Sequence, residues 1–300
     1  MNLALSIRPD ISSLEESSAI TLWQDLQVAP VVIAENKTVQ TSFVRQGVGN
    51  PALVLLHGFD SSFLEFRRLL PKLSIQQTVW SVDLFGFGFT QRFPQQPVGP
   101  PQIQQHLLNF LRSQIDSPVV LVGASMGGAV ALDFCLSYPE LVQGLVLLDS
   151  AGLAKPSTMG NLMFPPLDWL ATEILRRPWI RKQIGRTAYF DKDFSTEDAY
   201  RIGAFHLTQP YWREALIQFT KSGGYGSLAQ QLPQLTLPTL VLWGRNDDIL
   251  GIQDAVRFAQ LLPQSQLIWC ERCGHVPHLE QPQFTADMIQ RFMVRLTEKP

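Results

Sequence analysis

Residues 119–132, with the sequence VVLVGASMGGAVAL, decide the fold. The first four residues are apolar, as expected for a buried strand, and the small residues from Gly128 onward indicate the start of a helix. Between them stands Ser125, with a glycine two positions before it and another two positions after it. A strand, a sharp turn and a helix in this order lift a serine hydroxyl above a sheet. A small-residue turn of a nucleotide-binding unit is the alternative interpretation of so short a pattern.

Other short apolar runs alternate with longer amphipathic segments along the chain. This alternation is typical of βαβ units, in which helices cover both faces of a mostly parallel, twisted sheet. Segments 28–34 and 38–45 have the pattern of a hairpin, which we expect at the antiparallel edge of the sheet. The sequence therefore predicts an α/β fold with parallel strands at residues 53–56, 79–82, 119–122, 145–148, 239–242 and 266–269.

A long insertion separates the fourth and fifth of these strands. It covers residues 149–238, whereas a βαβ crossover needs only roughly 10 to 12 residues. Within it, residues 155–223 have the apolar spacing of helices and predict an inserted helical cap, or lid. Residues 1–154 and 224–300 are then expected to form the core domain, in which the first 26 residues show little periodicity.

Composition excludes several classes of protein. The chain has 300 residues, with 24 Lys and Arg against 26 Asp and Glu, and no basic block that would follow a nucleic-acid backbone. Three cysteines are too few for a disulfide framework and indicate a reducing compartment. The first residues lack the features of a signal peptide, and no stretch predicts a spanning helix. We therefore expect a cytoplasmic protein of unknown oligomeric state, for which peripheral membrane contact through an apolar lid stays open.

Acidic and imidazole side chains follow the last two predicted strands. A serine hydroxyl is a weak nucleophile near neutral pH, so it needs a base that is itself held by an acid. After a turn of this kind, the partners are expected in the order Ser, Asp, His. Asp247 and Asp248 follow the fifth strand, and His275 and His278 follow the sixth, so two candidates remain for each partner.

Four motifs carry a resemblance to a known family. They are His57-Gly58-Phe59, Gly123-Ala124-Ser125-Met126-Gly127, Trp243-Gly244-Arg245-Asn246-Asp247 and Gly274-His275. Through them the chain resembles the α/β-hydrolase superfamily, specifically its cap-bearing serine esterase-like branch, over about residues 53–296. The family uses an aspartate at the position of Ser125 for epoxide and haloalkane hydrolysis, which disfavours those two reactions here.

The resemblance implies a role for each matched residue. Ser125 would be the nucleophile, His275 the base and Asp247 the acid of a catalytic triad. The backbone N–H groups of Phe59 and Met126 would form the oxyanion hole. Neither a metal nor an organic cofactor is implied.

A rival pattern near the C-terminus consists of Cys270, Cys273, His275 and His278. Thiols and imidazoles ligate zinc, but structural zinc sites usually place a longer segment between their two ligand pairs. We therefore expect no metal site here. Among the other histidines, His106 is predicted in a surface helix.

The cap is expected to decide the substrate, because one fold and one triad serve several reactions. Its apolar residues favour a small-molecule ester with an apolar acyl or alcohol group. Alternatives are carbon–carbon bond hydrolysis, cofactor-free perhydrolysis, or a small-molecule receptor that retains the triad. Residues 83–90 and the N-terminus are also faintly similar to chlorophyll dephytylases. The residues on which the pocket prediction rests are Leu162, Met163, Phe164, Leu167, Trp169, Leu170, Phe205, Tyr211 and Trp212.

Overall fold

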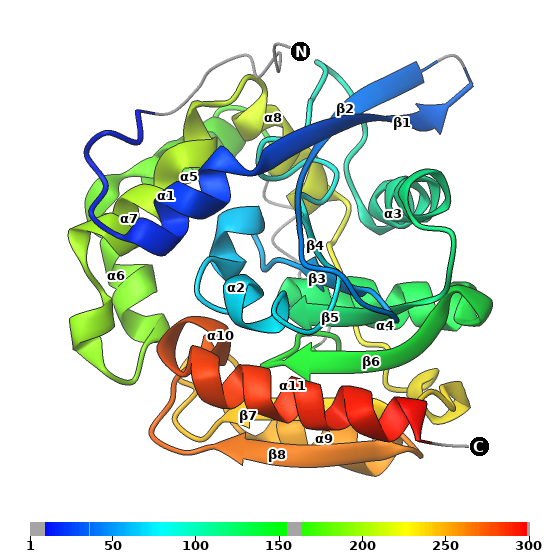
Figure 1. Ribbon diagram of the computed structural model, residues 1–300. Helices are drawn as coiled ribbons and strands as arrows, with labels where there is room; N and C mark the ends of the chain where they lie inside the picture. The colour runs from blue at the N-terminus through cyan, green and yellow to red at the C-terminus, as the bar shows by residue number, and fades with distance from the viewer. Residues whose placement is uncertain (1–9, 36, 155–163, 299–300) are drawn as a thin grey trace.

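The computed structural model describes residues 10–35, 37–154 and 164–298. In this part of the chain, eight strands form one sheet in the order β1-β2-β4-β3-β5-β6-β7-β8 (Figure 1). β1 pairs antiparallel with β2, and β2 with β4, whereas all the later neighbours pair parallel. The strands are β1 Leu26–Ala34, β2 Lys37–Gln46, β3 Leu53–Leu56, β4 Val79–Val82, β5 Val119–Ala124, β6 Val142–Leu148, β7 Thr239–Gly244 and β8 Ser265–Cys270. The predicted hairpin and all six predicted parallel strands are confirmed.

The central strands are apolar throughout because both faces of the sheet are covered. Every residue of β3, β5 and β7 is buried, and successive side chains point into two different core clusters. One cluster lies under α3, α4 and α9, and the other under α1, α2 and α11. These helices are α1 Ser17–Gln24, α2 Leu70–Leu73, α3 Pro100–Gln114, α4 Met126–Ser137, α9 Gln253–Leu261 and α11 Pro282–Thr297. The predicted α/β fold with helices on both faces is confirmed.

Among the described residues between β6 and β7 there are four α-helices, which lie at the left and the top of Figure 1. They are α5 Leu167–Arg176, α6 Pro178–Ala188, α7 Glu197–Ala204 and α8 Trp212–Lys221, and we call them the cap helices. The start of the predicted cap at residue 155 lies outside the described residues, so the domain boundaries stay a prediction. Shorter elements are η1 Phe63–Phe66, η2 Pro139–Leu141, η4 Lys192–Phe194, η5 Phe205–Thr208, η6 Leu232–Gln234 and α10 Pro277–Glu280.

The structure adds one helix that the sequence did not predict and corrects one expectation. Residues before β1 form helix α1, which buries Ala19 and Leu22; eight residues are too few to show a clear helical period. His106 does not lie on the surface of α3 but on its buried face, within 2.7 Å of the Thr41 hydroxyl in β2. Burial lowers the pKa of His106 to about 3, so this imidazole is neutral at physiological pH.

No helix in the described ranges combines the length and the apolar character that crossing a lipid bilayer requires.

Candidate active site

Ser125 occupies the sharp turn between β5 and α4. Its backbone has φ +50° and ψ −117°, a conformation that few residues other than glycine adopt. The turn is held by a hydrogen bond of 3.0 Å from the Ser125 N–H to the Leu148 carbonyl. A Cβ atom on Gly127 would lie 1.9 Å from the Leu56 oxygen, and one on Gly123 would lie 2.3 Å from the Gly127 oxygen. The two glycines therefore permit the close approach that exposes the serine.

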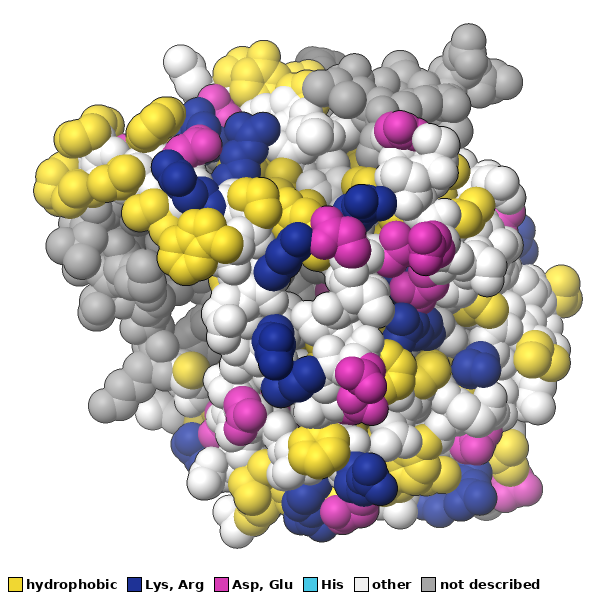
Figure 2. Space-filling model, turned by 90° about the vertical axis from the view of Figure 1, so that its left-hand side faces the viewer, with side chains coloured by type: hydrophobic (Ala, Val, Ile, Leu, Met, Phe, Trp, Pro, Cys, Tyr) yellow, Lys and Arg dark blue, Asp and Glu magenta, His cyan; other side chains and the backbone are white. Residues whose placement is uncertain are grey.

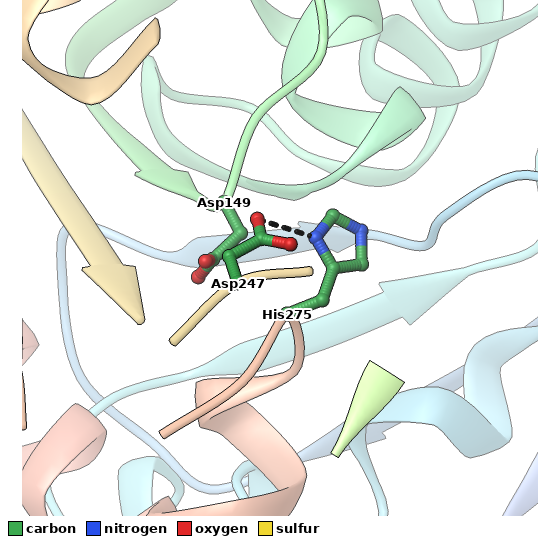
Figure 3. Close-up of side chains that lie close together, drawn as sticks. All are labelled: Asp149, Asp247 and His275. Carbon is green, nitrogen blue, oxygen red and sulfur yellow. Dashed lines mark hydrogen bonds and ion pairs between the residues drawn. The ribbon is translucent and has the colours of Figure 1, made fainter. Parts of the chain in front are cut away.

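His275 and Asp247 come together from the loops that follow β8 and β7. Their side chains are buried, and His275 Nδ1 lies 2.9 Å from Asp247 Oδ2. The other imidazole nitrogen, Nε2, points away from Asp247 (Figure 3). The backbone of His275 is fixed as well, because its N–H donates a 2.7 Å hydrogen bond to the Ala188 carbonyl in the cap. Nδ1 is thus held by Asp247, and Nε2 has no hydrogen-bond partner among the described residues.

The environment of Asp247 keeps its carboxyl ionised. Its Oδ1 accepts backbone N–H groups from Ile249 at 2.7 Å and from Leu250 at 3.0 Å. Burial alone would raise the pKa of Asp247, but His275 and these two N–H groups outweigh burial and hold the pKa below its ordinary value. An ionised carboxylate next to Nδ1 orients the imidazole and stabilises its protonated form.

The two competing residues lie elsewhere. Asp248 is exposed, next to the buried Asp247. His278 is buried between elements of the core, with Nε2 at 3.2 Å from Glu65 Oε1 and its ring 5.2 Å from that of Phe66. Of the four candidates, the structure brings Asp247 and His275 together.

Ser125 and His275 line one cavity of about 390 Å³. Phe59 lines it from the loop after β3, and Ile184 of α6 and Tyr189, which directly follows α6, line it as well. The described residues include no hydrogen bond between the Ser125 hydroxyl and His275. Such contacts are often long in an enzyme without substrate and tighten when one binds.

Two backbone N–H groups beside Ser125 are free to donate. Met126 is the first residue of α4, where an N–H has no partner within the helix. Phe59 lies in the loop after β3. The last residue of β3 pairs with Gly123 of β5, so the loops after β3 and β5 leave the sheet next to each other. Among the hydrogen bonds of the described residues, neither N–H has an acceptor. Phe59 is among the residues that line the cavity, whereas Met126 is not, so the oxyanion hole stays a prediction.

Asp60, which sequence reasoning missed, joins the core to the cap. It accepts hydrogen bonds from Trp212 Nε1 at 2.7 Å and from His206 Nε2 at 3.0 Å, and it pairs with Arg181. Burial alone would raise its pKa, but His206 and Arg181 hold the pKa of Asp60 far below its ordinary value. Asp60 directly follows Phe59, so the same loop carries a candidate oxyanion donor and the anchor of three cap residues.

The described cap residues predicted to line the pocket do not line it. Leu162 and Met163 fall outside the described residues, and none of the other seven is among the residues that line the cavity. Leu167, Trp169 and Leu170 of α5 are exposed, whereas Leu175 near the end of the same helix lines the cavity. Figure 2, which views the side of the molecule formed by the cap, shows hydrophobic and basic side chains together in its upper left part. Trp212 instead packs against Leu207 and Leu216 inside the cap.

Acidic and imidazole groups that could ligate a metal converge at one place. In the described ranges, the group consists of Asp149, Asp247 and His275, whose potential ligand atoms lie within 4.8 Å of one another. Asp247 and His275 are already joined by a hydrogen bond. Neither Cys270 nor Cys273 belongs to this group, although both are buried. The four residues of the zinc pattern therefore do not form a common ligand set.

Comparisons with known proteins agree with this architecture. Residues 53–288 match the model of the alpha/beta hydrolase family. The chain is 31% identical over 242 residues to the alpha/beta hydrolase domain-containing protein VTE7 of Arabidopsis thaliana, covering 80% of this chain and 73% of that protein. It is 29% identical over 264 residues to a 2-hydroxy-6-oxo-2,4-heptadienoate hydrolase of Pseudomonas putida, covering 85% of this chain and 93% of that protein. A thermophilic esterase from Thermogutta terrifontis superposes with a TM-score of 0.77 at 25% identity, covering 90% and 99% of the two chains. The family resemblance of the four sequence motifs is confirmed, and the chain belongs to the alpha/beta hydrolase family.

Proposed function

We propose that this hydrolase cleaves a carboxylic ester with an apolar acyl or alcohol group, and that Ser125 is its nucleophile. The observation that carries the proposal is that Ser125 and His275 line one cavity, while the buried Asp247 carboxylate lies 2.9 Å from His275 Nδ1. This arrangement supplies a nucleophile, a base and an orienting acid without a cofactor.

The proposed reaction has two halves that use the same residues. In the first, Ser125 Oγ attacks the ester carbonyl carbon while His275 Nε2 accepts the hydroxyl proton. The resulting oxyanion accepts hydrogen bonds from the N–H groups of Phe59 and Met126. His275 then gives its proton to the departing alcohol, and an acyl-enzyme ester remains on Ser125.

In the second half, water replaces the alcohol. His275 removes a proton from a water molecule, whose oxygen attacks the acyl carbon. The new oxyanion is held by the same two N–H groups, and Ser125 leaves with the proton from His275. The products are a carboxylic acid and the original enzyme. Asp247 stabilises the imidazolium in both halves.

The charges around the cavity favour a neutral substrate. Among the lining residues that the structure describes, the Lys and Arg side chains are Arg181 and Lys182. Arg181 forms an ion pair with Asp60, and Lys182 forms one with Glu197, with Nζ 2.6 Å from Oε2. An anionic substrate would therefore find no unpaired Lys or Arg in the described lining. Apolar side chains supply most of the remaining contacts, among them Leu175, Ile184, Ile249, Val276 and Leu279.

A carbon–carbon bond hydrolase is the second candidate, because one relative is named as a heptadienoate hydrolase. The name of that substrate denotes a carboxylate, for which a free cationic partner would be expected. The paired state of Arg181 and Lys182 favours the ester. Perhydrolysis and a receptor function use the same motifs and are outcomes of the experiment below.

The experiment compares kcat/KM for p-nitrophenyl esters of increasing acyl length, a long-chain isoprenoid ester and a 2-hydroxy-6-oxo-dienoate. We expect kcat/KM to rise with acyl length, by up to about 4-fold per buried CH₂ group, because each contributes roughly 0.8 kcal/mol. Ser125→Ala should remove the activity, and Ser137→Ala, a change at the exposed end of the same helix α4, should not. Preferred cleavage of the dienoate, peroxide-dependent turnover only, or tight binding without turnover would each contradict the ester proposal.

A further inference from the structure

A second buried carboxyl group lies beside Asp247. Asp149 directly follows β6, the strand next to β7, and its side chain is fully buried. Figure 3 shows Asp149 close to Asp247, with His275 on the other side of the Asp247 carboxyl group. Potential ligand atoms of all three residues lie within 4.8 Å of one another. The proposed triad does not use Asp149.

The two oxygens of Asp149 have different surroundings. Oδ1 accepts the backbone N–H of Gly244 at 2.9 Å. Oδ2 is buried, and no hydrogen-bond donor among the described residues faces it. A buried carboxylate oxygen without a donor is costly, whereas a protonated one can itself donate. The neighbouring Asp247 carboxylate is close enough for a side-chain hydrogen bond with Asp149 and can accept that proton.

Two carboxyl groups that are buried side by side do not both ionise, because like charges repel strongly where water is excluded. Asp247 holds the negative charge, since it faces His275 and accepts two backbone N–H groups. Burial and then the negative charge of Asp247 raise the pKa of Asp149 well above its ordinary value. Asp149 therefore carries a proton, and Asp247 carries the negative charge.

We propose that Asp149 is a protonated positioning residue that donates a hydrogen bond to the Asp247 carboxylate and holds that carboxylate toward His275. This inference rests on the proposed function, in which Asp247 orients His275. Asp149 touches neither the substrate nor the reacting atoms. Its backbone, with φ +40°, fixes the carboxyl group in a conformation that Asp and Asn tolerate better than most residues.

Substitutions at position 149 test the proton directly. Asp149→Asn keeps an oxygen for the Gly244 N–H and replaces the acidic proton with an amide N–H, so it should retain most of the activity. Asp149→Ala removes both groups and should lower kcat by roughly 10-fold or more with little change in KM, as for other residues that orient a catalytic group. A loss in Asp149→Asn equal to that in Asp149→Ala, or no loss in Asp149→Ala, would overturn the proposal.

A double-mutant cycle separates positioning from a general structural defect. If Asp149 acts through Asp247, then Asp149→Ala should have no further effect on kcat in an Asp247→Asn background. A structural defect would lower kcat by the same factor in both backgrounds, which would contradict the positioning role.

Two readouts need no substrate and keep the inference separate from the proposed function. The infrared difference spectrum of wild type minus Asp149→Asn at neutral pH should contain the C=O band of a protonated carboxylic acid. Wild type should also lose stability relative to Asp149→Asn as pH rises above the ordinary carboxyl pKa of 3.8, because the folded protein retains a proton that the unfolded chain releases.

Asp133→Asn, at a part-buried carboxyl group paired with Gln104, is the matched control and should leave the Asp149 band in place. If the band is present but esters are not cleaved, the proposed function fails alone; if esters are cleaved but the band is absent, this inference fails alone.

Discussion

His275 Nδ1 lies 2.9 Å from Asp247 Oδ2, although 28 positions separate the two residues in the sequence. The contact exists because β7 and β8 are parallel neighbours, so the loops that follow them meet at one edge of the sheet. Ser125 reaches the same cavity from β5. Three loops from one edge thus supply the proposed chemistry.

Substitution of the two neighbouring acids should give very different results. Asp247→Asn should lower kcat for an aryl ester by roughly 10⁴-fold, because an amide cannot stabilise the imidazolium and favours the wrong tautomer. Asp248→Asn should change kcat little, since Asp248 is exposed. Steady-state kinetics of both variants provide the check, and equal losses would contradict the assignment of Asp247.

A methyl group on Gly127 should destroy the turn that carries Ser125. Gly127→Ala would place Cβ 1.9 Å from the Leu56 oxygen, a contact that only a shift of the backbone relieves. We expect a fall of several kcal/mol in the free energy of unfolding, or no soluble protein. Gly185→Ala is the matched control: its Cβ would have no atom within 4 Å, and alanine favours the helix α6 by up to about 1 kcal/mol. Urea denaturation measures the stability of both variants. A Gly127→Ala protein as stable as the wild type would show that Gly127 does not approach the Leu56 oxygen this closely.

Removing the charge of Asp60 should loosen the cap. Asp60→Asn leaves Arg181 and His206 without their shared carboxylate, and breaking a buried pair costs about 3 to 5 kcal/mol. Amide hydrogen exchange should become faster in α6 and α8 than in the sheet. Asp254→Asn, which removes a pair with the half-exposed Arg257, should change stability by less than about 1 kcal/mol. Unchanged exchange in the cap of Asp60→Asn would show that this anchor is not needed.

The buried pair of Glu65 and His278 predicts that the stability of the folded protein falls at low pH. Burial alone would raise the pKa of Glu65, but the hydrogen bond and charge of His278 outweigh burial and lower the pKa to about 2. Because the folded pKa lies below the ordinary value of 4.5, this stabilisation is complete above pH 4.5 and is lost as pH falls toward 2. Wild type should lose about 3 kcal/mol more than Glu65→Gln over that range. Thermal denaturation at several pH values measures the difference, and parallel profiles would contradict it.

Much of the core could be predicted from the sequence because its signals are local. Apolar runs bounded by Gly, Asp or His mark the parallel strands, and Ser125 is flanked by its own turn and helix. His106 was placed wrongly although a local signal existed: Ile103, Leu107 and Phe110 lie on the same helical face and are buried. That spacing could have identified His106 as a core residue.

The residues missed near the site depend on contacts that are distant in the sequence. Asp60 pairs with residues 121 to 152 positions away, and no pattern around it announces those partners. Asp149 was within reach, because it follows a predicted strand as Asp247 does. The prediction was wrong for the seven described residues, because hydrophobicity alone does not tell which apolar residues of a helix are turned toward Ser125.

Labelling with a fluorophosphonate probe tests whether Ser125 is the nucleophile, because the probe bonds covalently to an activated serine. We expect rapid labelling of the wild type and of Ser137→Ala, and none of Ser125→Ala. The labelled peptide should contain Ser125. Equal labelling of wild type and Ser125→Ala, or a labelled peptide without residue 125, would contradict the role of Ser125.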